Sequence, residues 1–266
     1  MITNRFPLRK AYLYIVLPAY NEEESIGKLL DRIQYYLLDS GVENYKVIVV
    51  NDGSTDHTLE ILKEYEQQMP LNIVQHEKNQ GLGPTLRDGL LYAAQRAAYN
   101  DIVITMDADD THTPGLIYRM VNTMREGYDV VIASRYQKGS RVYGVSLYRE
   151  FLSLMASYIF RLILPIKGVK DFTCGYRAYR ARVLQDAFNK YGEHFIDQQG
   201  FQAMVDIILR LRTMNVIFGE VPFILRYDMK QGISKMNVKS TILKTLRLII
   251  KRRFEKNNEE APDKIL

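Results

Sequence analysis

The chain has 266 residues, of which 47% are hydrophobic and 25% charged, and its formal net charge is +5. This length and composition predict a globular protein built around one large α/β domain, and the modest positive charge favours anionic partners. The single cysteine, Cys174, excludes an internal disulfide framework, and no apolar run reaches the roughly 18 to 20 residues that a membrane-spanning helix needs. Because the first residues lack the charged-then-apolar form of a signal peptide, we expect a cytoplasmic protein.

Short apolar segments rich in Val and Ile alternate along the chain with longer segments of helical periodicity. The short segments predict buried strands at residues 12–18, 46–51, 71–75, 102–106 and 129–134. The longer ones predict amphipathic helices at residues 22–38, 56–68, 84–98 and 114–126. This alternating order predicts an α/β fold with a mainly parallel central sheet flanked by helices.

Polar and acidic residues gather at the ends of four predicted strands. The first strand ends in PAYNEEES, the second in NDGSTD, the fourth in DADDTH and the fifth in SRY. Each stretch alone also fits a turn or a helix cap. Ligands of such sheets bind beyond the carboxyl ends of the strands, so together these stretches indicate one site. A carboxylate cluster there predicts a hard divalent cation such as Mg²⁺ or Mn²⁺.

The order and spacing of PAYNEE, VVNDGSTD, NQGLGPTLRDG, MDADDTHTP, ASRY and DFTCGYRAY resemble the motifs of family 2 glycosyltransferases with the GT-A fold. Within that family the chain is most similar to the polyprenyl-phosphate glycosyltransferases, the group that contains dolichol-phosphate mannose synthase. The resemblance covers roughly residues 11 to 236. We therefore expect a glycosyltransferase domain over residues 1–236, followed by a basic amphipathic helix and a frayed tail over residues 237–266.

The resemblance implies a donor site for a nucleotide-diphosphate sugar, either a GDP-sugar or a UDP-sugar. The residues that would line its nucleotide pocket follow the first two strands and are Pro18, Tyr20, Glu22, Val50 and Asp52.

The DAD motif, Asp107, Ala108 and Asp109, would hold the donor and a catalytic Mg²⁺ or Mn²⁺, with Asp109 as the direct metal ligand. The family often has glutamine two residues further on, where this chain has Thr111, so Thr111, His112 or water would complete the metal shell. The cation would stabilise the charge that develops on the departing diphosphate.

Arginines would bind the phosphates of donor and acceptor, because a guanidinium can contact two phosphate oxygens at once. The resemblance assigns Arg135 a catalytic role at both phosphates, and Arg149 and Arg177 to the acceptor phosphate. A surface ion pair is the competing interpretation for each arginine. In the segment RYDMKQGISKM, Lys235 would clasp the donor phosphate with Arg226; because Arg226 lies three residues too far upstream, Lys230 is the alternative.

Two acceptor classes remain open. A lipid phosphate is ionised near neutral pH and attacks unaided, whereas a hydroxyl acceptor needs a general base. The chain has no Trp, so the QxxRW motif of processive polysaccharide synthases is absent, and QGFQAMVD contains no ED base motif.

We therefore expect an inverting transfer of a mannose- or glucose-like sugar to a dolichyl or undecaprenyl phosphate. One alternative is transfer to a glycan or another hydroxyl acceptor in cell-surface polysaccharide synthesis, with Asp206 as the base; otherwise Asp206 faces solvent or caps a charge network. A nucleotide-binding or membrane-docking module without catalysis is a further alternative, and the intact DAD motif argues against it.

Two segments indicate contact with a membrane surface. Residues 147–166 are apolar around most of a helix, which fits a core helix or, as the resemblance implies, an interface helix that lies on the bilayer. Further on, a basic amphipathic pattern is typical of binding to anionic lipids or to a partner protein, and its apolar face comprises Ile242, Leu243, Leu246, Ile249 and Ile250. We expect a peripheral protein on the cytosolic face of a membrane that binds no nucleic acid.

Overall fold

The structure is a computed structural model that describes residues 11–229 and 238–255. Its centre is a seven-stranded sheet in the order β3-β2-β1-β4-β7-β5-β8. Strand β7 runs antiparallel to β4 and β5, and the other neighbouring pairs are parallel. The strands of this sheet are β1 (Leu13–Ala19), β2 (Tyr45–Asn51), β3 (Leu71–Gln75), β4 (Ile102–Thr105), β5 (Val130–Ser134), β7 (Arg177–Arg180) and β8 (Phe218–Pro222). The expected α/β fold with a mainly parallel sheet is thus confirmed.

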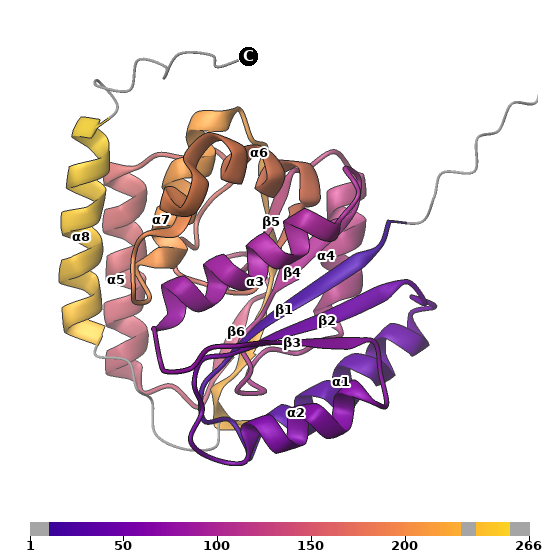
Figure 1. Cartoon of the computed structure of the whole chain (residues 1–266). Helices are drawn as coiled ribbons and strands as arrows, with labels where there is room; N and C mark the ends of the chain where they lie inside the picture. Colours follow the sequence, from indigo (N-terminus) through magenta and orange to yellow (C-terminus); the bar gives the residue numbers. More distant parts are fainter. Residues whose placement is uncertain (1–10, 230–237, 256–266) are drawn as a thin grey trace, which may run out of the picture.

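Helices cover both faces of the sheet (Figure 1). Helix α3 packs on β1 and β2 from one side and also contacts α6, whereas α1 and α2 pack on the other side. At one end of the molecule α5 and α8 run side by side (Figure 1). The helices are α1 (Ile26–Asp39), α2 (Thr58–Glu66), α3 (Leu82–Arg96), α4 (Leu116–Arg125), α5 (Leu147–Ile163), α6 (Ala181–Tyr191), α7 (Ala203–Leu211) and α8 (Val238–Glu255).

The sequence pattern explains the core directly. In α1 the apolar residues recur at helical spacing, and this stripe is buried against the sheet; it comprises Ile26, Leu29, Leu30, Ile33 and Leu37. Strands β4 and β5 are buried along their whole length, as expected for β-branched residues in a sheet that is covered on both faces.

The sequence pattern did not predict β7, β8 or a small second sheet. Strand β7 reads RAYR, so it shows no apolar run, and it is nevertheless inserted between β4 and β5. The second sheet pairs β6 (Arg141–Tyr143) with β9 (Ile224–Arg226) in parallel. These short strands bring the chain after β8 back to the loops that follow β4 and β5.

Helix α8 packs against α5 and α7. Leu248 and Ile249 are buried, Leu246 is half-buried and Leu243 is exposed, so part of the apolar face that we expected to bind a membrane contacts the protein instead. The expected boundary between residues 236 and 237 lies outside the described residues. Within the described ranges, no helix combines the length and the apolar character that crossing a bilayer requires.

Candidate active site

The loops after β1 and β2 are joined by side-chain hydrogen bonds. Asn21 has a left-handed backbone (φ 52°), and its N–H donates to Ser54 Oγ at 2.9 Å. The Glu22 N–H donates to Thr58 Oγ1 at 2.9 Å. Pro18 and Val50 are register partners in the two strands. The structure therefore brings the PAYNEE and NDGSTD segments, and with them most of the expected nucleotide pocket, to one edge of the sheet.

Ser25 links this edge to the DAD motif. Its Oγ lies 2.8 Å from Glu22 Oε2 and 3.2 Å from the carbonyl oxygen of Ala108. The end of β1 and the end of β4 thus share one buried hydroxyl, which places Glu22 beside the acidic segment.

Asp52, one of the residues expected to line the nucleotide pocket, is hydrogen-bonded to the segment between β3 and α3. Its buried carboxylate accepts hydrogen bonds from the N–H groups of Gln80 and Gly81, each at 2.9 Å, and its Oδ1 lies 2.7 Å from His76 Nδ1. On the far side of the ring, His76 Nε2 lies 3.0 Å from Asp88 Oδ2. Asp52 therefore organises the loop between β3 and α3, and its effect on a nucleotide would pass through that loop.

The three aspartates of DADDTH have separate environments. The Asp107 side chain is 43% exposed, whereas Asp109 is only 8% exposed. Asp109 Oδ1 accepts from Thr111 N–H at 3.2 Å and from Thr111 Oγ1 at 2.7 Å. Asp110 has a left-handed backbone (φ 57°) and pairs with Arg32 of α1, so its carboxylate belongs to that ion pair.

His112 holds Asp107 in place. Its Nδ1 accepts from the Asp107 N–H at 3.0 Å, and its Nε2 lies 3.5 Å from Asp107 Oδ2. The ring is buried and stacks on Tyr176 at a centroid distance of 5.1 Å. We had considered His112 as a substitute metal ligand, but the ring is engaged with Asp107 itself.

The donor set of this loop fits a hard cation. Asp107 and Asp109 supply carboxylate oxygens, and Thr111 Oγ1 keeps lone pairs while it donates to Asp109. Among the residues that the structure describes, no three His, Cys, Asp or Glu side chains gather into a metal-binding group. Mg²⁺ and Mn²⁺ take oxygen ligands, and water and substrate phosphates commonly fill part of their coordination shell.

Arg135 forms a bidentate ion pair with Asp171. Its Nε and Nη2 each lie 2.8 Å from an oxygen of that carboxylate, and its Nη2 also donates to Thr173 Oγ1 at 2.6 Å. Burial alone would raise the pKa of Asp171, but the charge and hydrogen bonds of Arg135 outweigh it and hold the pKa below its usual value. Sequence analysis missed Asp171, although an acid in the motif DFTCGYR was the available signal. The ion pair therefore fixes Nε and Nη2 of the Arg135 guanidinium in position.

The DFTCGYR segment passes beneath the DAD motif. A Cβ placed on Gly175 would lie 3.0 Å from Asp107 Oδ1 and 3.7 Å from the end of the Met204 side chain. Thr105 Oγ1 donates to the Gly175 carbonyl at 2.6 Å. A side chain at this position would press on the Asp107 carboxylate, which would have to shift by a few tenths of an ångström.

Arg177 does not lie where an acceptor phosphate could reach it. Its side chain is 0% exposed, and its guanidinium donates to the carbonyl oxygens of Phe172, Cys174 and Met204 at 2.7 to 2.8 Å. The expected phosphate contact is therefore corrected: Arg177 begins β7 and ties three backbone segments together.

Three further basic residues were assigned to phosphates. Arg226 ends β9, and its exposed guanidinium pairs with Asp228 at 2.8 Å. The backbone N–H of Arg226 donates to the Thr111 carbonyl at 3.3 Å, so the end of β9 contacts the acidic loop. Lys235 lies outside the described residues, as does its alternative Lys230, and the side chain of Arg149 in α5 is likewise not described.

Asp206, considered as a general base, is part of a buried charge network. Its carboxylate accepts from Arg252 Nε and Nη2 of α8 at 2.8 and 2.9 Å, and Arg252 also reaches Asp197 at 3.2 Å. Burial raises the pKa of Asp206 against the opposing charge of Arg252. Of the two interpretations, the charge network is the one that the structure displays.

Comparison with known proteins identifies the family of this chain. The pattern described as Glycosyl transferase family 2 matches residues 14–188. The chain belongs to glycosyltransferase family 2.

Two relatives have curated names. The dolichol-phosphate mannosyltransferase of Pyrococcus furiosus is 31% identical over 236 residues, which are 88% of this chain but only 62% of that protein. The polyprenol monophosphomannose synthase of Mycolicibacterium smegmatis is 28% identical over 247 residues, which are 91% of this chain and 88% of that protein.

A similar solved structure is glucosyl-3-phosphoglycerate synthase from Mycobacterium tuberculosis in complex with Mn²⁺, UDP and phosphoglyceric acid. It is 19% identical, with a TM-score of 0.65 over 91% of this chain and 78% of that one. The same synthase has also been solved with Mg²⁺ and UDP. At this identity the similarity concerns the fold, and it agrees with the GT-A fold that the motifs implied.

Proposed function

We propose that the chain transfers a sugar from a nucleotide-diphosphate sugar to a polyprenyl phosphate at a membrane surface, with a divalent cation held at Asp107 and Asp109. The observation that carries the proposal is the position of α5. Its outer face is apolar and exposed, and its inner face contacts the loops that hold Arg135 and Asp171. The names of both curated relatives support the same acceptor class and favour mannose as the sugar.

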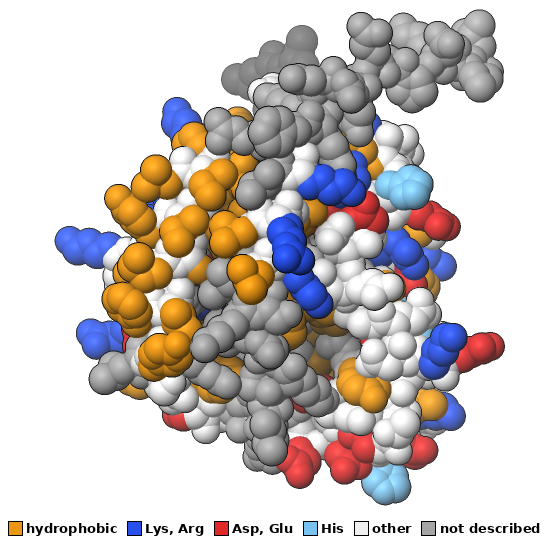
Figure 2. Space-filling model, turned by 90° about the vertical axis from the view of Figure 1, so that its left-hand side faces the viewer, with side chains coloured by type: hydrophobic (Ala, Val, Ile, Leu, Met, Phe, Trp, Pro, Cys, Tyr) orange, Lys and Arg blue, Asp and Glu red, His pale blue; other side chains and the backbone are white. Residues whose placement is uncertain are grey.

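Hydrophobic side chains gather on the face formed by α5 and α8 (Figure 2). Leu162 alone is 68% exposed. We call this surface the α5 patch, and its exposed members are Tyr148, Phe151, Leu154, Met155, Tyr158, Ile159, Leu162 and, from α8, Leu243. Lys167, Lys244 and Arg247 are exposed on the same elements or just after them. An exposed apolar patch with basic neighbours suits the interfacial region of an anionic bilayer.

An acceptor that is already ionised fits the surroundings of Asp107. Gly175 and the end of the Met204 side chain lie beside Asp107 and cannot act as a base, and the nearby His112 ring is buried, bonded to Asp107 and stacked on Tyr176. Asp206, the acid considered for that role, is paired with Arg252. A phosphate acceptor needs no proton removed, whereas a hydroxyl does.

The donor side follows from the acidic loop and the loops after β1 and β2. A bound Mg²⁺ or Mn²⁺ supplies a Lewis acid that stabilises negative charge on the leaving diphosphate. Asp107 and Asp109 would hold that cation, and His112 and Thr111 fix the two carboxylates in position. Pro18, Tyr20, Glu22 and Val50 would line the nucleotide pocket, closed on one side by the loop that Asp52 organises.

The transfer is a single displacement at the anomeric carbon. An oxygen of the acceptor phosphate forms a bond to this carbon from the face opposite the diphosphate. The anomeric C–O bond breaks, and its electron pair leaves with the nucleoside diphosphate, which inverts the configuration. Arg135, held by Asp171, would place positive charge at the acceptor phosphate.

The test uses purified protein, Mn²⁺ and vesicles that contain polyprenyl phosphate, with a panel of labelled GDP- and UDP-sugars. We expect one donor to label the lipid fraction. The variant Asp109→Ala should lower turnover by about 100-fold or more, because charge on the leaving group is then poorly compensated.

Label that appears only in a hydroxyl acceptor such as a glycan would contradict the proposal and favour the alternative acceptor class. Donor binding without release of diphosphate would contradict catalysis altogether. A thermal-shift comparison of the same donors on the wild type and on Asp109→Ala shows whether the variant still folds and binds nucleotide.

A further inference from the structure

Helix α5 divides its side chains between two surfaces. Ser153, Ser157 and Phe160 recur at helical spacing on the inner side, whereas Phe151, Met155 and Leu162 belong to the α5 patch. The helix that carries the patch is therefore also the helix that touches the interior of the site.

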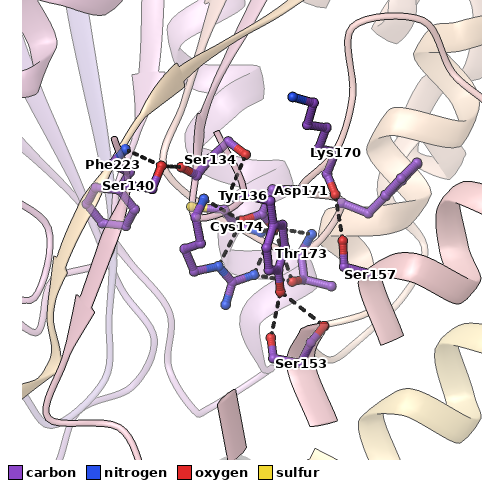
Figure 3. Close-up of polar contacts among 12 residues, drawn as sticks. Ser134, Tyr136, Ser140, Ser153, Ser157, Lys170, Asp171, Thr173, Cys174 and Phe223 are labelled. Carbon is purple, nitrogen blue, oxygen red and sulfur yellow. Dashed lines mark hydrogen bonds and ion pairs between the residues drawn. The ribbon is translucent and has the colours of Figure 1, made fainter. Parts of the chain in front are cut away.

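The inner side contacts both loops of the Arg135–Asp171 pair (Figure 3). Tyr136, which follows Arg135, points its hydroxyl at Ser153, 3.0 Å from the carbonyl oxygen and 2.8 Å from Oγ. Ser157 Oγ donates to the carbonyl of Lys170, the residue before Asp171, at 2.8 Å. The Phe160 ring meets Phe172 edge-on at a centroid distance of 6.3 Å. Successive turns of α5 therefore contact the two segments that carry Arg135 and Asp171.

Tyr136 occupies the central place in this arrangement. Its ring centroid lies 5.5 Å from the guanidinium carbon of Arg135, and its N–H donates to Ser134 Oγ at 3.2 Å. Its hydroxyl is the group that joins the Arg135 loop to α5 by hydrogen bonds. Burial raises the pKa of the Tyr136 phenol, which keeps the donor proton in place.

We infer that Tyr136 is a positioning residue that couples α5 to Arg135, so that the helix resting on the membrane sets the arginine that meets the acceptor phosphate. This inference rests on the proposed function for the identity of the acceptor. The coupling itself concerns only the contacts of Tyr136, Ser153 and Arg135.

The decisive variant is Tyr136→Phe, which removes one hydroxyl and keeps the ring. We expect the KM for polyprenyl phosphate to rise by about tenfold, the size that one lost hydrogen bond in a buried network predicts, while the KM for the donor changes little. Ser153→Ala keeps the carbonyl acceptor and should have a smaller effect on the same constant. The matched control is Tyr65→Phe, which removes a hydroxyl bonded to Asp31 at 2.8 Å on the α1–α2 side.

Hydrogen exchange supplies a readout that does not depend on the acceptor. In Tyr136→Phe, amides of α5 and of the segment around Asp171 should exchange faster, while those of α1 remain as in the wild type; Tyr65→Phe should show the reverse. If wild-type protein transfers no sugar to polyprenyl phosphate, the proposed function fails and exchange alone decides the coupling. The inference is overturned if Tyr136→Phe matches the wild type in both measurements, or if the KM values of donor and acceptor rise equally.

Discussion

Gly83 shows how closely the segments around the nucleotide loop are packed. It lies in the first turn of α3, and a Cβ at this position would stand 1.5 Å from the carbonyl oxygen of Gln198. The backbone after η1 (Gly192–Ile196) therefore rests directly on the start of α3, next to the loop that Asp52 holds.

We predict that Gly83→Ala destabilises the protein by about 2 to 4 kcal/mol, because backbone must move to make room. The control is Gly27→Ala in α1, where the nearest atom to the new Cβ is 3.5 Å away. That change should be neutral or stabilising by up to about 1 kcal/mol, since alanine favours a helix. Denaturant unfolding of both variants measures the difference, and equal stabilities would disprove the packing described for Gly83.

At the residue scale, the sequence predicted that Asp107 and Asp109 lie together at a strand end, but it did not predict that Arg177 is buried. Asp107 and Asp109 fall together because both follow a buried strand, and strand ends meet at one edge of a parallel sheet. The predicted phosphate contact of Arg177 was wrong because a motif identifies a residue but not the direction of its side chain. In β7 this side chain points inward, where it donates to three buried carbonyl groups. The role of His76 depends on contacts between distant segments, which no local pattern reveals.

At the scale of elements, α8 is attached to the rest of the protein by charge as well as by apolar packing. Arg252 is the link, since it bonds Asp206 of α7, which is fully buried. Ile249 and Leu248 pack beside it. A buried acid that loses its partner is strongly destabilising, whereas removal of both charges costs much less.

We predict that Arg252→Leu lowers the free energy of unfolding by about 3 to 5 kcal/mol and that adding Asp206→Leu restores most of this loss. The double variant should also retain sugar transfer, because Asp206 faces Arg252 and not the acceptor. Urea unfolding measures the first part and lipid labelling the second. A double variant that is stable but inactive would instead support Asp206 as the general base for a hydroxyl acceptor.

Element prediction succeeded where one face or both faces of an element are apolar. The first five strands and four helices follow from periodicity alone, close to their observed bounds. Strand β7 was not predicted, because it is only four residues long and its sequence, RAYR, contains a buried arginine in place of an apolar run. The sequence predicted a basic amphipathic helix in the region of α8 but not what its apolar face contacts, because the pattern is the same whether that face meets lipid or protein.

At the scale of the whole molecule, the α5 patch lies on the end where α5 and α8 run together (Figures 1 and 2). We predict that Phe151→Ser combined with Leu162→Ser weakens binding to anionic vesicles by about tenfold or more, because two exposed apolar side chains no longer enter the bilayer. Sedimentation with vesicles measures the partition. The control, Leu38→Ser, removes a comparably exposed leucine from α1 on another part of the surface.

Vesicle binding at the wild-type level in the double variant would show that the α5 patch does not bind the membrane. Binding that falls in both variants alike would point to a general effect of hydrophobicity. Either result would contradict membrane contact of the α5 patch, on which the proposed lipid acceptor depends. The assignment of the family and the fold would not be affected.

The most direct measurement compares two acceptors that differ in one group: polyprenyl phosphate and the matching polyprenol, presented in the same vesicles with the donor found in the panel and Mn²⁺. The proposed function predicts transfer to the phosphate and little or none to the alcohol, since an ionised oxygen attacks without a base. Transfer to the alcohol at a comparable rate, or transfer to neither lipid, would contradict a site built for a lipid phosphate.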